Sequence, residues 1–136
     1  MGGVAGTAVR SGGPVLAGWR VLVVEDEWLI AAQVGRALEG AGAAVLGPAG
    51  SVGRALELLA DGSPPPDAAL LDVNLGGEPV TPVALALAGL GVPFALVTAY
   101  AADGLDGPLR AAPRVGKPFT AAGLVRAVAR LRPDAV

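Results

Sequence analysis

The sequence predicts an α/β domain: an open, doubly wound parallel sheet with helices packed on both faces. Short apolar runs alternate five times with longer segments of helical periodicity, which favours parallel strands joined by helical crossovers. The runs are apolar at successive positions, as is typical of strands covered on both sides. Polar residues able to do chemistry follow several runs, and in such a sheet they gather at the carboxyl ends of the strands.

The N-terminal part of the chain predicts a tail, then the first strand and the first helix. Residues 1–18 are rich in glycine and other small residues, so we expect a flexible tail there, a domain over 19–131 and a second tail over 132–136. Arg20–Val24 is a β-branched run too short for a helix and predicts a buried strand. A helix is predicted over Trp28–Leu38, ending at a glycine stop signal. Its expected apolar positions are Leu29, Ala32, Gly35/Arg36 and Leu38.

The middle of the chain predicts two further strands and two further helices. Ala43–Pro48 is a short apolar run, and Ser51 can cap the helix that follows it. The apolar positions of this helix are Val52, Ala55, Leu56 and Leu59. The Pro-rich stretch 61–66 must be a surface loop, after which 68–71 forms a third buried strand that closes on Asp72. Thr81 or Pro82 can open a helix that runs to about Gly89.

The last third predicts two strands and a final helix around a broken segment. Phe94–Val97 forms the fourth strand and is followed by Thr98, and 114–116 forms a weak fifth strand. Glycines and prolines interrupt Ala101–Pro113, so any fourth helix is short or irregular and loosely held. A helix over Thr120–Leu131 closes the domain. Its apolar face carries Leu124, Val125, Val128 and Leu131.

Composition excludes several classes of chemistry. The chain has 136 residues, 53% hydrophobic and 16% charged, which suits one domain with a buried core. Cysteine and histidine are both absent, so disulfides, thiolate or imidazole metal sites, Ser-His-Asp triads and a phosphohistidine within this chain are excluded. The net charge of −2 argues against nucleic-acid binding.

The sequence indicates no membrane segment and no export signal. No apolar run reaches the ~18 residues that a membrane span needs. The N-terminal segment lacks the basic start and apolar stretch of a signal peptide. We therefore expect a cytoplasmic location, without membrane partners.

An acidic cluster is expected where the first and third strands end. Glu25, Asp26 and Glu27 follow the first strand, and Asp72 ends the third. If these two strands are neighbours, the carboxylates lie close together and repel one another unless a cation neutralises them. Oxygen ligands without histidine or cysteine suit Mg²⁺, and the backbone carbonyl of Asn74 could join them.

Two further residues turn this cluster into a candidate phosphoryl-acceptor site. Lys117, after the fifth strand, supplies a point charge suited to a phosphate oxygen, and Thr98 offers a hydroxyl. A carboxylate nucleophile beside Mg²⁺, a lysine and a hydroxyl could accept a phosphoryl group on Asp72.

Each residue taken singly has a simpler interpretation. Acids after a strand often cap a helix, a lysine before proline is usually a solvated loop charge, and a lone aspartate often begins a turn. Trp28 is expected to be partly packed. A phosphatase of the haloacid-dehalogenase type would need a second aspartate where Asn74 stands. Only the joint occurrence of the residues favours the phosphoryl-acceptor site.

Four motifs carry a resemblance to a known family. Val21–Glu27, Leu70–Asn74, Val97–Ala99 and Lys117–Phe119 each follow a predicted strand. In this order and spacing they resemble bacterial response-regulator receiver domains over residues 18–131. The resemblance implies a flavodoxin-like (βα)5 fold with strand order 2-1-3-4-5.

The same resemblance implies roles for the site residues. Asp72 would be phosphorylated by a sensor histidine kinase or a phosphotransfer protein. Asp26 and Asp72 would bind Mg²⁺ directly with the Asn74 carbonyl, and Glu25 through water. Thr98 and Lys117 would hold the phosphoryl oxygens.

A narrower resemblance concerns Val92–Tyr100, which is similar to the Pro-Phe-x-Phe-x-Thr-Gly-Tyr signature of the stand-alone receivers called the FAT GUY group. Leu96 and Ala99 depart from the signature. Arg114 occupies the place three residues before the lysine where many receivers carry a switch aromatic. Tyr100 is therefore the nearest substitute, and Thr98 with Tyr100 is the expected switch pair.

The expected function is a stand-alone receiver that catalyses only its own phosphorylation and dephosphorylation. Five residues follow Leu131, too few for an output domain, so signalling would require an unknown protein target, or the chain would be a phosphate sink or relay. A pseudo-receiver that binds partners without phosphorylation is the alternative. A small-molecule phosphatase is disfavoured because the clustered carboxylates are its only available general acids. The oligomeric state stays open.

Overall fold

The computed structural model describes residues 14–99 and 107–132, and it has the predicted open parallel sheet. The strand order β2-β1-β3-β6-β7 is the expected 2-1-3-4-5 arrangement once a small hairpin, β4–β5, is set aside. The sheet strands are β1 (Arg20–Val24), β2 (Ala44–Ala49), β3 (Ala68–Asp72), β6 (Phe94–Thr98) and β7 (Arg114–Gly116). All four pairings within this sheet are parallel.

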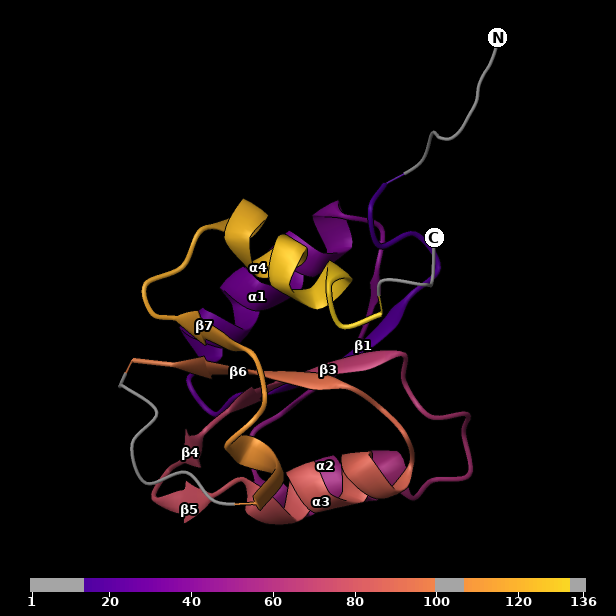
Figure 1. The fold of residues 1–136 in the computed structure, drawn as a ribbon, viewed down its shortest axis with the longest axis vertical. Coiled ribbons are helices and arrows are strands. Elements are labelled where there is room, and N and C mark those ends of the chain that lie inside the picture. The colour runs from indigo at the N-terminus through magenta and orange to yellow at the C-terminus, as the bar shows by residue number, and fades with distance from the viewer. Residues whose placement is uncertain (1–13, 100–106, 133–136) are drawn as a thin grey trace, which may run out of the picture.

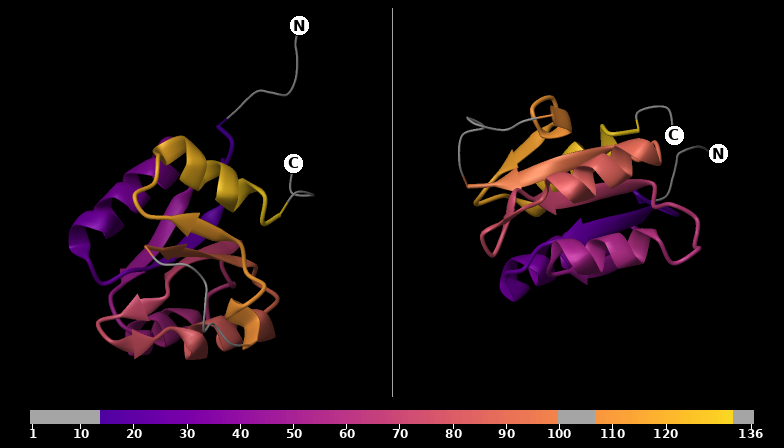
Figure 2. Two further views of the ribbon diagram at one scale, coloured as in Figure 1. Left: turned by 60° about the vertical axis from the view of Figure 1, so that its left-hand side comes forward. Right: turned by 90° about the horizontal axis from the view of Figure 1, so that it is seen from below.

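Helices cover both faces of the sheet. One face carries α1 (Trp28–Gly40) and α4 (Ala121–Ala129); the other carries α2 (Val52–Leu59), α3 (Thr81–Gly89) and the 3₁₀ turn η1 (Gly107–Leu109). Figures 1 and 2 show these two helical layers with the sheet between them. The central strands are apolar on both sides because each side packs against a helical layer. The fold class predicted from the sequence is therefore confirmed.

The cap predicted at Ser51 is present, and Thr120, predicted as the first residue of the last helix, is instead its cap. The Ser51 hydroxyl accepts a hydrogen bond of 3.1 Å from the Arg54 amide, and the Thr120 hydroxyl accepts one of 3.0 Å from the Gly123 amide. Each cap satisfies a backbone donor that would otherwise lack a partner at the start of its helix.

The apolar face predicted for α1 is right at Leu38 and wrong at Leu29 and Ala32, which are exposed. The helix buries Ala31, Val34 and Leu38, whereas Leu29 is 54% exposed. Small residues at many positions gave the hydrophobic pattern little contrast, and the spacing of three and four residues from Ala31 sets the true packing face. Trp28 was expected to be partly packed but is 80% exposed.

The N-terminal tail expected over 1–18 ends earlier than predicted. Leu16 is completely buried in the core beneath α1 and α4, and its amide donates a 2.8 Å hydrogen bond to the Ala41 carbonyl. Gly42 has φ +97°, and a Cβ atom there would stand 2.9 Å from Pro14 Cβ. Pro14–Gly18 therefore packs on the domain because a large apolar side chain anchors it. Residues 1–13 and the tail from 133 onward lie outside the described part.

The segment predicted to lack a regular fourth helix is described from Gly107 onward. The described part, 107–113, forms only the short η1 turn and no regular helix. Leu109 and Ala112 are nevertheless buried in the core cluster, so this end of the segment is anchored rather than loosely held. Within the described residues, no helix is both long and apolar enough to cross a membrane.

Candidate functional site

The predicted site residues converge at one edge of the sheet. In the strand register, Val24 pairs with Leu71 and Asp72 with Val97, while Thr98 pairs with Gly116. Glu25 and Asp26 therefore emerge beside Asp72, and Thr98 emerges beside the residue before Lys117. The Lys117 amide also donates a 2.9 Å hydrogen bond to the Thr98 carbonyl. Parallel strands that end together thus gather five side chains from four different strands.

Three carboxylates lie close enough to share a cation. One oxygen each from Glu25, Asp26 and Asp72 fall within 4.8 Å of one another. Glu25 is 5% exposed and Asp72 9% exposed, whereas Asp26 faces solvent. Hard oxygen donors, partly open to water, fit Mg²⁺, which keeps several waters and takes few protein ligands. The predicted acidic cluster is present in the structure, and its chemistry fits the predicted ion.

A single lysine faces this cluster. The Lys117 Nζ atom lies 3.3 Å from Glu25 Oε1, 3.9 Å from Asp72 Oδ2 and 3.7 Å from Glu27 Oε1. The lysine side chain is only 16% exposed, so these interactions are less screened than surface pairs. Glu27, the N-cap residue of α1, makes no capping hydrogen bond with its side chain and is instead a partner of Lys117. One positive charge still leaves the cluster with an excess of negative charge.

Burial and the neighbouring Asp72 change the pKa of Glu25. Burial, followed by the hydrogen bond with Asp72, raises the pKa of Glu25 from 4.5 to about 7. The Glu27 amide, which donates to Glu25 Oε2 at 3.2 Å, and the charge of Lys117 act in the opposite direction. The pKa of Glu25 therefore lies close to neutral pH in the protein without a metal ion, and a cation bound beside it would favour the ionised carboxylate.

The structure describes the other residues singled out in the sequence to different extents. Tyr100, the expected switch residue, lies outside the described residues. The backbone of Asn74 lies in β4 (Asn74–Leu75), paired with Pro79 of β5 (Glu78–Pro79). Arg114 donates from Nη2 to the Arg110 carbonyl at 3.0 Å and so ties β7 to the segment after η1.

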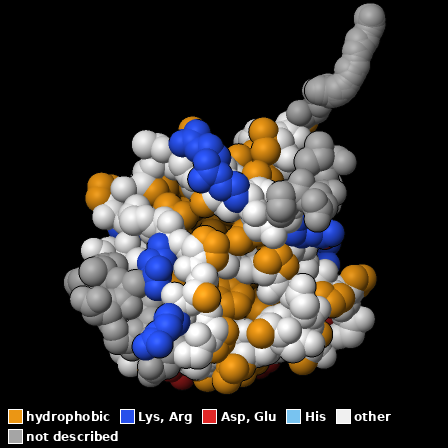
Figure 3. Space-filling view, viewed as in Figure 1, with side chains coloured by type: hydrophobic (Ala, Val, Ile, Leu, Met, Phe, Trp, Pro, Cys, Tyr) orange, Lys and Arg blue, Asp and Glu red, His pale blue; other side chains and the backbone are white. Residues whose placement is uncertain are grey.

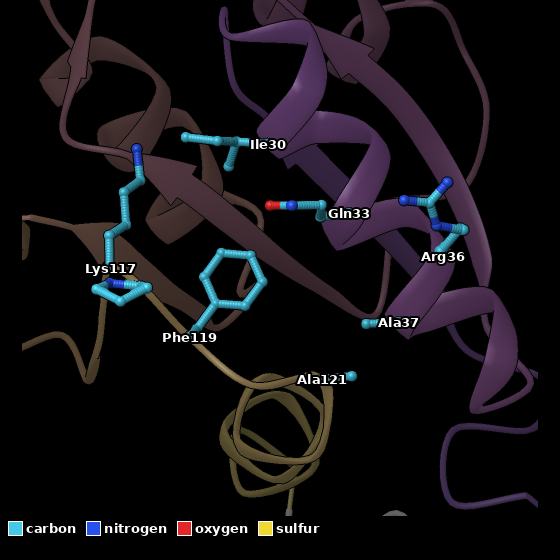
Figure 4. Close-up of a pocket in the computed structure, with 8 residues that line it drawn as sticks. Ile30, Gln33, Arg36, Ala37, Lys117, Phe119 and Ala121 are labelled. Carbon is cyan, nitrogen blue, oxygen red and sulfur yellow. The ribbon is translucent and has the colours of Figure 1, made fainter.

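An open groove beside the acidic cluster was not predicted from the sequence. A pocket of about 690 Å³ lies between α1 and the start of α4, with Lys117 at one end (Figure 4). Its apolar walls include Ile30 and Phe119, and Arg36 and Gln33 supply polar groups. Ile30, a large apolar lining residue of this groove on α1, is not among the positions predicted for the core face, and no pattern in the sequence marked it as a pocket wall.

The surface charge is unevenly distributed. Residues 107–132 contain six lysines or arginines and no aspartate or glutamate. Figure 3 shows separate lysine or arginine side chains over the face that carries α4, β7 and η1, with apolar atoms between them and acidic atoms only at the margin. This face would attract an acidic surface and repel a basic one.

Solved structures resemble the chain over most of its length. SdrG from Sphingomonas melonis Fr1 is 42% identical, with a TM-score of 0.72, and the match covers 86% of this chain and 97% of SdrG. A BeF3-activated conformation of SdrG, from Pseudomonas melonis Fr1, is 41% identical, with a TM-score of 0.69, and the match covers 82% and 95%. The REC domain of the PhyR response regulator from Erythrobacter litoralis is 26% identical, with a TM-score of 0.74, and the match covers 87% and 92%.

A longer protein shares the fold. The response regulator PhyR from Brucella abortus is 23% identical, with a TM-score of 0.70 over 83% of this chain, and the chain spans 47% of its length. No family model and no curated protein matches the sequence.

The sheet order, the acidic cluster and its lysine define a receiver-type domain. Together with the identity to SdrG over nearly all of that protein, they establish that the chain belongs to the response-regulator receiver family.

Proposed function

We propose that Asp72 accepts a phosphoryl group from a sensor histidine kinase or a phosphotransfer protein in a Mg²⁺-dependent reaction. The observation that carries this proposal is the position of the Asp72 carboxylate, within 3.9 Å of Lys117 and within the three-carboxylate cluster. Its side chain is 11% exposed, which leaves an approach for a donor. The phosphorylated form would signal by binding a protein target, or the chain would serve as a phosphate sink or relay.

The chain's own residues divide the work of the transfer. An Asp72 oxygen forms the new bond to phosphorus as the bond between phosphorus and the donor imidazole nitrogen breaks, and that nitrogen takes up a proton. Asp26 and Asp72 would hold Mg²⁺ with the Asn74 carbonyl, and Glu25 would act through water. Bound there, the ion offsets the charge of the transferring oxygens. Lys117 would leave its carboxylate partners for a phosphoryl oxygen, and the Thr98 hydroxyl would bind a second one.

The relatives and the surface support this proposal. SdrG has a solved BeF3-activated conformation, and BeF3 on a carboxylate imitates a phosphoryl group. The groove that ends at Lys117 gives a phosphoryl donor an apolar surface beside the acceptor. The basic face over α4, β7 and η1 would suit an acidic target.

We further propose that the chain is a cytoplasmic member of the FAT GUY group and catalyses no reaction beyond its own phosphorylation and dephosphorylation. Pro93, Phe94, Thr98 and Tyr100 supply the matching positions of the signature. SdrG, which the chain matches over 97% of its length, is the relative that best supports a small receiver of this kind.

Intact mass measurement tests the proposal. Wild type, Asp72→Ala and the matched control Asp61→Ala, an exposed loop aspartate, are incubated with Mg²⁺ and phosphoramidate. We expect one addition of ~80 Da in wild type and in Asp61→Ala, and none in Asp72→Ala. Absence of any addition would instead indicate a pseudo-receiver, and sustained phosphate release with turnover a phosphatase.

A further inference from the structure

A short hairpin follows Asp72 directly and lies against the acidic cluster. Its strands β4 and β5 pair antiparallel, Asn74 with Pro79 and Leu75 with Glu78. The turn is Gly76–Gly77, with φ of +57° and +91°, a conformation that favours glycine at both positions. The hairpin therefore continues the acceptor strand into a defined turn rather than a free loop.

The turn contacts one of the candidate metal ligands. A Cβ atom on Gly76 would lie 3.3 Å from Asp26 Oδ2, so the backbone of the turn stands beside that carboxylate. The other side of Asp26 is close to Gly50, where an added Cβ would lie 3.9 Å from Asp26 Cα. Asp26 is otherwise exposed, so the Gly76 backbone beside Oδ2 limits the directions in which its carboxylate can turn.

The hairpin is tied to the rest of the domain by apolar and polar contacts. Leu75 and Val80 are buried in the core cluster, and the Val80 amide donates to the Val73 carbonyl at 3.3 Å. On the exposed strand β5, Glu78 Oε1 accepts a hydrogen bond of 3.4 Å from the Val52 amide, the first residue of α2. A carboxylate at that position also meets the positive end of the helix dipole.

We propose that Glu78 is a positioning residue for the metal site. By tying β5 to the start of α2, it holds the Gly76 turn against Asp26 and so keeps the Asp26 carboxylate directed toward the cation. This inference rests on the proposed function, because it takes Asp26 to be a Mg²⁺ ligand. Glu78 itself binds neither the ion nor the phosphoryl group in this proposal.

The effect should appear in metal affinity and not in folding. Groups that orient metal ligands typically change affinity by about 10- to 100-fold when removed. Because the tie to Asp26 runs through a backbone turn, we expect the lower end, about tenfold. A hydrogen bond at an exposed position contributes little to global stability, so the metal-free protein should unfold as wild type does.

Both partners of the hydrogen bond can be changed separately. Glu78→Ala removes the acceptor, and Glu78→Gln keeps an acceptor oxygen without the charge. Val52→Pro removes the donor at the first helical residue, where the backbone tolerates proline, and Ser51 already has the extended backbone that precedes proline (φ −150°, ψ 161°). Because the Val52 side chain is 7% exposed and packs in the core, this variant counts only if its urea unfolding matches that of wild type, and otherwise Glu78→Ala against Glu78→Gln decides. Glu39→Ala, an exposed glutamate at the far end of α1, is the matched charge control.

Mg²⁺ is titrated into each full-length variant while the backbone amide signals of Asp26 and Gly76 are followed by NMR, and urea unfolding is measured in EDTA. We expect Glu78→Ala and Val52→Pro each to weaken Mg²⁺ binding about tenfold, and the double variant to be no weaker than either single one. Glu78→Gln and Glu39→Ala should bind within about twofold of wild type.

The proposal is overturned if Glu78→Ala binds Mg²⁺ as wild type does. It is also overturned if Glu78→Gln or Glu39→Ala weakens binding as much as Glu78→Ala, because charge alone would then be the cause. Failure of the proposed function is a different result: wild type binds Mg²⁺, but the intact mass measurement shows no phosphoryl group on Asp72.

Discussion

Replacing Glu25 by glutamine should remove a large pH dependence from the stability of the metal-free protein. Folding raises the pKa of Glu25 from 4.5 to about 7, chiefly through burial and its hydrogen bond with Asp72. A raised pKa means that the folded protein binds this proton more tightly than the unfolded chain does. The stabilisation is complete below the unfolded pKa and is lost as the pH rises through the folded one.

The shift sets the size of the effect. A rise of the pKa from 4.5 to about 7 corresponds to about 3 kcal/mol between the two limits. Wild type in EDTA should therefore lose about 3 kcal/mol of unfolding free energy between about pH 4.5 and about pH 8, beyond what other groups contribute. Glu25→Gln cannot ionise and should lack this component.

Urea unfolding curves of wild type and Glu25→Gln, measured in EDTA across this pH range, test the reasoning. Subtracting one free energy of unfolding from the other cancels the titration of groups common to both proteins. The stability of Glu25→Gln relative to wild type should therefore increase as the pH rises. Saturating Mg²⁺ should shrink the gap at high pH by favouring the ionised Glu25 of wild type. Parallel curves in EDTA would refute the assigned protonation.

Three further outcomes are expected. Lys117→Ala should fold but melt at a lower temperature at low ionic strength, because the repulsion between the carboxylates is left uncompensated. Its response to beryllofluoride should vanish. A full wild-type response would mean that Lys117 is only a solvated charge. Leu16→Ala should cost about 2–5 kcal/mol in urea unfolding, since the side chain is fully buried, and a neutral result would return Pro14–Gly18 to a flexible tail. Asp26→Asn should abolish the change in Trp28 fluorescence on Mg²⁺ titration, and an unchanged titration would remove Asp26 from the metal site.

The sheet and its functional edge were predictable because their signals are local. Short apolar runs in the sequence indicate buried parallel strands, and Asp72 and Thr98 occur where such runs end. The order of the strands is a property of long-range packing, and for this chain it came only with the resemblance to a family. Once the order is known, the meeting of Glu25, Asp72 and Lys117 follows from the register.

The packing face of α1, the docking of Leu16 and the β4–β5 hairpin could not be predicted, because no difference in hydrophobicity along the sequence marks them. The packing face of α1 was misassigned because alanine and glycine are compatible with either face, so Leu29 was placed inside although it is exposed. Leu16 lies in glycine-rich surroundings that give no sign of a docking site under α1. The strands β4 and β5 have two residues each, too short for any periodicity, so this hairpin was not predicted.

The position of the phosphoryl group in the chain is the most direct test of Asp72 as the acceptor. Protein treated with Mg²⁺ and phosphoramidate is reduced with borohydride, which converts an aspartyl phosphate to homoserine, and its peptides are then sequenced by mass spectrometry. We predict homoserine at Asp72 alone, and only when Mg²⁺ is present. Homoserine at another aspartate, or an unmodified Asp72 in protein that has taken up the phosphoryl group, would contradict this assignment.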